Sequence, residues 1–133
     1  MLRFTRPLFN VAKRSTGITG LKVHPNPLPE LVKTYQTTLS VLSSIPETSV
    51  YRQGVEALTR HRLGVVEAAN GDIAAVESQL KDGQIEETLD IASDELSLAS
   101  KMLEWKAWEP LQETPAPGQW TYQGETTTAS SST

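Results

Sequence analysis

Three carboxylates in the C-terminal half are spaced in a way that could hold a metal ion. Glu87, Asp90 and Asp94 recur at steps of three and four residues, which places them on one face of a helix. A metal site in a helical bundle also needs His or further carboxylate ligands from a facing helix. The preceding helical stretch offers only Glu56 and Glu67. A solvated acidic face is therefore the favoured interpretation, and a small metal-dependent helical enzyme using these three residues is the alternative.

Other residues that commonly carry catalysis form no recognisable motif. His24 and His61 are 37 residues apart and lack the HExxH spacing of a zinc protease. The glycine-containing stretch 17–20 follows no expected strand and lacks the GxxxxGK pattern that cradles phosphates. The chain has no cysteine, which excludes disulfides, thiolate metal ligands and thiol nucleophiles. We therefore predict no catalytic residue, no metal ligand and no bound cofactor.

One segment has the composition of a protein-binding surface. Residues 101–111 contain two of the three tryptophans and one of the two methionines, and both residue types are enriched at protein interfaces. The competing interpretation is that both Trp rings close the end of a helical bundle. A small bundle cannot easily bury both, so we expect at least one to face a partner or the C-terminal segment. The candidate partner interface is Met102, Trp105, Trp108 and Leu111.

The first two helices can be located from their start and stop signals. Asn26 followed by Pro27 predicts a helix start, because Asn caps helices and Pro is tolerated in the first turn. Pro46 predicts its end near residue 44. A second helix is expected from residue 48 or 49. Gly54 and Gly64 would weaken it, and they would let a neighbouring helix approach closely.

The remaining helices follow a turn at residues 70–72. Asp72 caps a short expected helix that holds Ile73, Val76 and Leu80. Apolar residues then recur at steps of three and four from Ile85 to Leu103, the clearest helical periodicity in the chain. No stretch alternates as a strand would. The predicted fold is all-α, an antiparallel three-helix bundle with extended N- and C-terminal segments.

Charge is unevenly distributed along the chain. Residues 1–29 carry five basic and no acidic side chains, whereas residues 30–133 carry the other seven basic and all 16 acidic ones. An acidic body argues against nucleic acid as a partner. The longest apolar runs are far shorter than the roughly 20 residues that span a bilayer, so no transmembrane segment is expected.

The basic N-terminus has the composition of a mitochondrial targeting segment. Residues 1–14 are amphipathic, rich in arginine and free of acids, although Pro7 would weaken a helix there. The alternative is a basic arm that stays on the protein and docks on an acidic surface. The expected organisation is a basic segment over 1–15, a helical domain over 16–113 and an extended tail over 114–133.

Four blocks of the sequence resemble one known family, the small 13-kDa-type accessory subunit of mitochondrial respiratory complex I (NADH:ubiquinone oxidoreductase). They begin at Thr16 with TGITGLKV and continue through YR, VE and RL between Tyr51 and Leu63. The third is GQIEE from Gly83, and the last runs from Glu95 to Leu111 and includes EWKAWEPL. The tryptophan block is the most specific.

The resemblance implies a helical subunit on the matrix side of the inner membrane. Its expected partners are hydrophilic core subunits near the quinone module of the peripheral arm. The family's role is assembly and stability of that arm, and its members carry no iron–sulfur cluster, flavin or quinone site. The Thr/Ser-rich tail after Pro117 lies outside the shared pattern.

Overall fold

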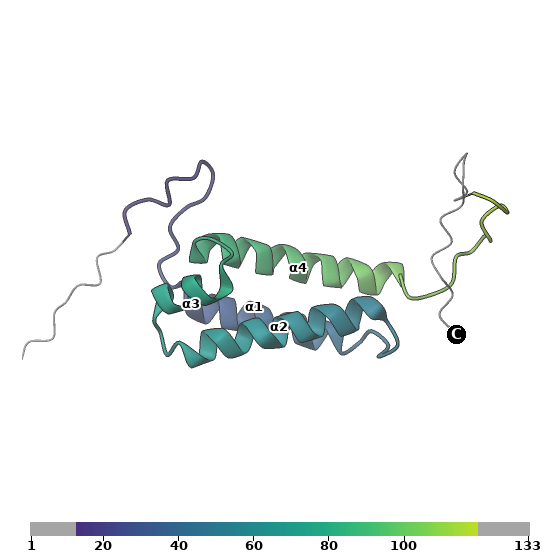
Figure 1. Cartoon of the computed structure of the whole chain (residues 1–133), viewed down its shortest axis with the longest axis horizontal. Coiled ribbons are helices and arrows are strands. Elements are labelled where there is room, and N and C mark those ends of the chain that lie inside the picture. Colours follow the sequence, from purple (N-terminus) through teal and green to yellow (C-terminus); the bar gives the residue numbers. More distant parts are fainter. Residues whose placement is uncertain (1–12, 120–133) are drawn as a thin grey trace, which may run out of the picture.

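Four α-helices make up the body of the described chain. The computed structural model describes residues 13–119. Helix α1 spans Pro27–Leu42, α2 Val50–Ala68, α3 Ile73–Leu80 and α4 Ile85–Trp105. No strand occurs within residues 13–119. Three long helices lie side by side, and the short α3 sits at the end where α4 begins (Figure 1).

The structure confirms the all-α class but not the count of three helices. The eight-residue α3 is a helix in its own right, begun by Asp72, whose carboxylate accepts a hydrogen bond from the Ala75 backbone N–H at 3.2 Å. It ends at Lys81, which has a left-handed backbone with φ of 57°. The bundle is therefore three long helices and one short one.

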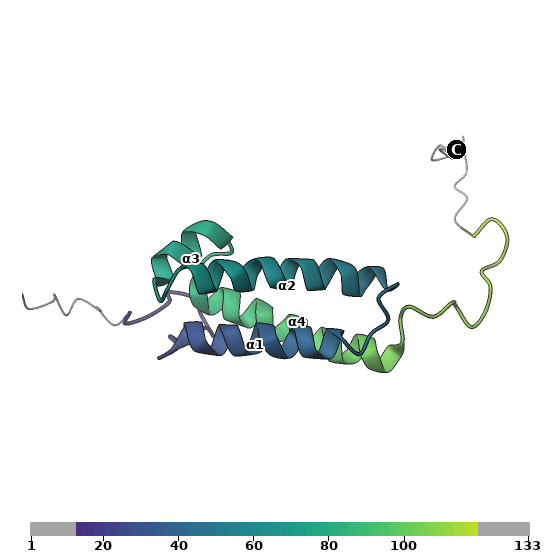
Figure 2. The same ribbon diagram turned by 90° about the horizontal axis from the view of Figure 1, so that it is seen from below.

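Helix α1 is the central element of the core. It packs against both α4 and α2, whereas α2 and α4 meet each other only weakly. One buried cluster joins α1 to α2, α3 and α4 through side chains that include Leu31, Val76 and Ile85. A second cluster near the other end joins Leu42 to Ala99. Figure 2, viewed from below, shows α1 and α2 as neighbouring rods with α4 behind them.

None of the helices within the described residues is long and apolar enough to cross a membrane. The two ends of the described chain leave from opposite ends of the bundle (Figure 1). Residues 13–26, which we call the N-terminal strap, lie beside the start of α4, and residues 106–119 extend beyond its end.

The two glycines in α2 make no close contact with another helix of the described chain. A Cβ atom added at Gly54 or Gly64 would meet nothing within 4 Å. No helix of the described chain approaches them, because both residues face outward from the core.

Replacement of these glycines should stabilise the isolated protein. Gly64→Ala is expected to raise the free energy of unfolding by up to about 1 kcal/mol, since Ala restricts the unfolded backbone and fits the open space. Urea unfolding of the purified protein measures this. Gly83→Ala is the contrast: φ is +94° there and an added Cβ would collide with the Glu87 carboxylate, so this variant should lose stability. A loss of stability for Gly64→Ala would contradict the open space that surrounds this residue.

Candidate functional site

The tryptophan segment divides into an exposed half and a packed half. Trp105 ends α4 and is 62% exposed, and Leu111 is also exposed. Met102 and Trp108 are half-buried and pack against the cluster of Leu42, Ile45 and Ala99. Only part of the candidate partner interface is therefore used to close the bundle.

The backbone turn after α4 produces this division. Lys106 adopts a left-handed conformation with φ of 51°, and its N–H donates to the Met102 carbonyl at 3.0 Å. Glu109 N–H then donates to the Lys106 carbonyl at 2.9 Å. The reversal carries Trp108 back onto the bundle and leaves Trp105 outside. Exposed ion pairs lie beside Trp105, one of them between Lys101 and Glu104 at 2.9 Å.

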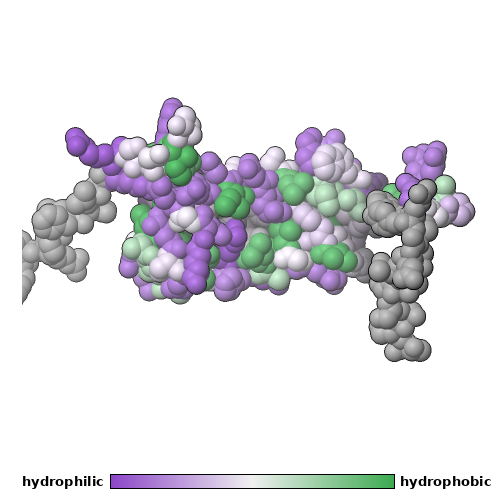
Figure 3. All heavy atoms as spheres, turned by 45° about the horizontal axis from the view of Figure 1, so that its top comes forward, coloured by the Kyte–Doolittle hydropathy of each residue, from purple (hydrophilic) through white to green (hydrophobic). Residues whose placement is uncertain are grey.

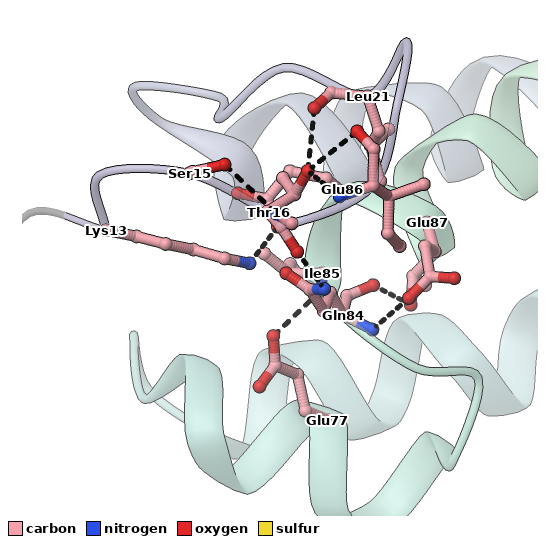
Figure 4. Close-up of polar contacts among 12 residues, drawn as sticks. Lys13, Ser15, Thr16, Leu21, Glu77, Gln84, Ile85, Glu86 and Glu87 are labelled. Atoms are coloured by element: carbon pink, nitrogen blue, oxygen red, sulfur yellow. Dashed lines mark hydrogen bonds and ion pairs between the residues drawn. The ribbon is translucent and has the colours of Figure 1, made fainter.

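A second cluster of polar contacts fastens the N-terminal strap to the start of α4 (Figure 4). Lys13 Nζ lies 2.6 Å from Glu86 Oε2, and the Glu86 side chain is only 4% exposed. The Gln84 side-chain amide donates to the Thr16 carbonyl at 2.7 Å. Thr16 in turn donates its hydroxyl to the Leu21 carbonyl at 2.7 Å, which closes the loop of the strap. These contacts tie together residues about 70 positions apart in the chain.

Two further carboxylates satisfy the first backbone N–H groups of α4. Glu87 Oε2 accepts from the Gln84 N–H at 2.7 Å, and Glu77 Oε1 on α3 accepts from the Ile85 N–H at 2.8 Å. These groups would otherwise lack partners at a helix start. Gly83 leaves room for the Glu87 carboxylate, and its positive φ makes the turn. The GQIEE block is thus a structural junction between α3, α4 and the strap.

The pKa of the Glu86 carboxyl lies below its ordinary value of 4.5. Burial alone would raise this pKa. The hydrogen bond and positive charge of Lys13 outweigh burial, together with backbone hydrogen bonds from Glu86 and His24. The carboxylate is therefore held ionised by the fold.

The three carboxylates of the alternative metal site do not form one. No group of three or more His, Cys, Asp and Glu residues that could hold a metal ion occurs within residues 13–119. Glu87 turns back to cap α4, while Asp90 and Asp94 are exposed on its outer side. The hypothesis of a metal-dependent enzyme loses its structural support because Glu87, one of its three proposed ligands, caps α4 instead.

The two histidines lie in separate places. His24 belongs to the strap, where its Nδ1 accepts from the Asn26 N–H at 3.2 Å, and His61 is exposed on α2. Neither is joined to a Ser or Asp in a catalytic relay by any hydrogen bond among the described residues. The polar contacts described above instead hold the helices and the strap in place.

The contact between Lys13 and Glu86 is of the kind expected for a basic arm that stays on the protein and docks on an acidic surface. The sequence does not single out the two residues, because residue pairs so far apart have no local pattern that would join them. The signals for the pair are the acid-free basic N-terminus and an acid in the first turn of a strongly periodic helix.

The comparisons with known proteins agree with one another. A family model described as "ETC complex I subunit conserved region" matches residues 20–87, about half of the chain. The chain is 47% identical over 111 residues to the Candida albicans protein named NADH dehydrogenase (ubiquinone) 1 alpha subcomplex subunit MCI4, covering 83% of this chain and 79% of that protein. It is 44% identical over 108 residues to the Bos taurus protein named NADH dehydrogenase (ubiquinone) 1 alpha subcomplex subunit 5, and this match covers 81% of this chain and 92% of that protein. A probable subunit 5 of Arabidopsis thaliana is 43% identical over 103 residues, and this match covers 77% of this chain and 60% of that protein.

The strap contact should make stability depend on pH. Glu86 has a depressed pKa in the folded protein, so its stabilisation is present above the ordinary value of 4.5 and is lost as pH falls through the folded value. Glu86→Gln should lower the free energy of unfolding at pH 7 by about 1–3 kcal/mol. The difference from wild type should shrink as the pH falls below 4.5.

Denaturant unfolding at pH 7 and at pH 3.5 measures both effects. Glu104→Gln is the matched control, because Glu104 is an exposed acid paired with Lys101 and its loss should cost less than about 0.5 kcal/mol. Equal effects of the two substitutions at pH 7 would contradict a stabilising role for the buried pair.

Proposed function

The chain belongs to the family described as the ETC complex I subunit conserved region, and on that premise we propose that it is a non-catalytic accessory subunit of mitochondrial NADH:ubiquinone oxidoreductase. The observation that carries the proposal is the match of about four-fifths of the chain to proteins named as alpha subcomplex subunits of this complex. The described residues offer polar ties between helices, which suits a structural role.

We further propose that the subunit stabilises the matrix-side peripheral arm at the inner membrane. Its partners would be hydrophilic core subunits near the quinone module. The exposed Trp105 and Leu111 support an interface role, because large apolar side chains at a helix end gain free energy when a partner covers them. Residues 1–15 would direct import into mitochondria, and residues 114–133 would be an extended tail.

The mechanism we propose is stabilisation by burial. A protein that binds only the assembled state of a complex shifts the equilibrium toward that state. The body supplies a rigid platform, since the strap, the caps and the two core clusters hold α4 in place. Trp105 then presents its ring without a large ordering cost.

Native-gel separation of mitochondrial complexes tests the subunit assignment. An epitope-tagged copy of the chain should migrate with NADH dehydrogenase activity, and deletion of the gene should reduce the amount of the assembled complex. Protease treatment of mitochondria with ruptured outer membranes should leave the chain intact if it faces the matrix. A chain that migrates alone in wild-type mitochondria would overturn the proposal.

The exposed tryptophan should matter for incorporation more than for folding. Trp105→Ala is expected to leave the helical circular dichroism and melting temperature of the purified protein unchanged, and to reduce its incorporation into the complex about tenfold. Trp108→Ala should instead lower the free energy of unfolding by about 1–3 kcal/mol, because its half-buried ring packs on the bundle. Native gels and thermal unfolding of both variants separate the two roles. Normal incorporation of Trp105→Ala would remove this ring from the interface.

A further inference from the structure

The outer face between α2 and α4 carries an apolar stripe that no part of the described chain covers. Ile91, Leu98 and Trp105 on α4 follow one another at steps of seven residues, and all three are more than 40% exposed. Leu58 on α2 is 48% exposed. Figure 3, in which the α4 side of Figure 1 comes forward, shows hydrophobic areas along the middle of this long face. We call these four residues the groove stripe.

A hollow lies at the middle of the groove stripe. It has a volume of about 90 Å³, and its lining includes Leu58 and Ile91 from the two helices, with Tyr35 of α1 between them. This is more than one water molecule needs. Exposed apolar walls around such a hollow fit an inserted apolar side chain.

The floor of the hollow holds an unused polar group. Tyr35 is 3% exposed, and its hydroxyl makes no hydrogen bond within the described residues. Burial raises the pKa of this hydroxyl, and the neighbouring Arg62 guanidinium opposes the rise. The Arg62 side chain also lines the hollow, so its floor is polar while Leu58 and Ile91 form its apolar rim.

The spacing of the groove stripe indicates a helix as the occupant. Apolar residues seven apart on one helix form the seam against which a second helix packs side by side. On α2, Tyr51, Leu58 and Val65 have the same spacing, and Tyr51 donates to Glu95 of α4 at 2.6 Å across the groove. Next to them the α2 surface has Gly54, where an added Cβ atom would meet nothing within 4 Å. A helix can therefore approach the backbone of α2 closely.

The charge along the groove specifies the chemistry of that helix. The outer edge of α4 carries Asp94, which is exposed and without an ion pair among the described residues, while Asp90 one turn before it lines a hollow with Lys22 of the strap. An acidic edge beside an apolar seam favours a helix with basic side chains beside its own apolar stripe. A second copy of this chain would bring the same carboxylates against these, and like charges at an interface oppose association.

We propose that the groove between α2 and α4 binds one amphipathic helix of a neighbouring subunit, with an apolar stripe on Leu58, Ile91 and Leu98 and Lys or Arg side chains toward Asp94. This proposal rests on the subunit assignment above and adds a second contact surface, continuous with Trp105. The bundle then becomes a four-long-helix arrangement that is completed only in the complex.

Photo-crosslinking in the intact complex tests the occupant directly. A benzophenone amino acid placed at Leu58 or at Leu98 should crosslink to a peptide of another subunit that is amphipathic and rich in Lys or Arg. The same group at Ile18, which is 42% exposed on the strap, should not reach that peptide. A crosslink to a second copy, to this chain's own residues 1–12 or 120–133, or to no protein would overturn the proposal.

Substitution tests the energetics of the same surface. Leu98→Glu should reduce incorporation at least about tenfold, whereas Ile18→Glu, equally exposed but away from the groove, should incorporate normally. Asp94→Lys should also reduce incorporation. Circular dichroism of the purified variants checks their fold, and if Leu98→Glu fails to fold, the crosslinks decide.

The two proposals fail in different ways. If wild-type chain migrates with complex I but Leu98→Glu incorporates normally and the groove gives no crosslink, the groove proposal is wrong and the subunit assignment stands. If the wild-type chain does not migrate with the complex, the assignment itself is wrong.

Discussion

The structure depends on one helix, α1, being shared by both halves of the core. Leu31 and Tyr35 belong to one buried cluster and Leu42 to the other, so a single apolar stripe on α1 holds α2 on one side and α4 on the other. A helix has room for two neighbours along such a stripe. The cost is that α2 and α4 scarcely cover each other. The inward faces of α2 and α4 are buried within the chain, whereas apolar side chains on part of their outward faces remain exposed.

Buried polar contacts then set how the helices lie along one another. Such contacts contribute little net free energy but penalise misalignment, because a partner left unpaired in the interior is costly. Tyr51 donates to Glu95 at 2.6 Å and joins α2 to α4, and Arg62 lies 2.9 Å from Asp82 before α4. Most of these residues fall in the blocks by which the sequence resembles its family. The residues of these blocks therefore hold the helices at fixed positions along one another.

Much of the secondary structure could be predicted from the sequence because its signals are local. Ser49 and Asp72 cap helices within a residue of where they were expected, and α4 begins at the predicted Ile85. The groove could not be predicted, since the apolar arc of α2 includes both buried and exposed positions and periodicity does not say which neighbour covers which part. Leu58 lies at helical spacing from Tyr51, Val55 and Val65 on α2, but it is half exposed. The interface role of Trp105 likewise stays a prediction, because exposure alone names no partner.

The N-terminal strap has a consequence for the order in which the protein can fold. Lys13 and Thr16 leave the ribosome early, yet their partners Glu86 and Gln84 follow about 70 residues later. At ribosomal rates of roughly 5–20 residues per second, the strap must wait about 4–15 s for them. The apolar stripe of α1 waits with it, because Ile85 and Ala99 also come from α4. The half of the core between α1 and α4 therefore closes last, and until then part of the apolar stripe of α1 stays open to solvent.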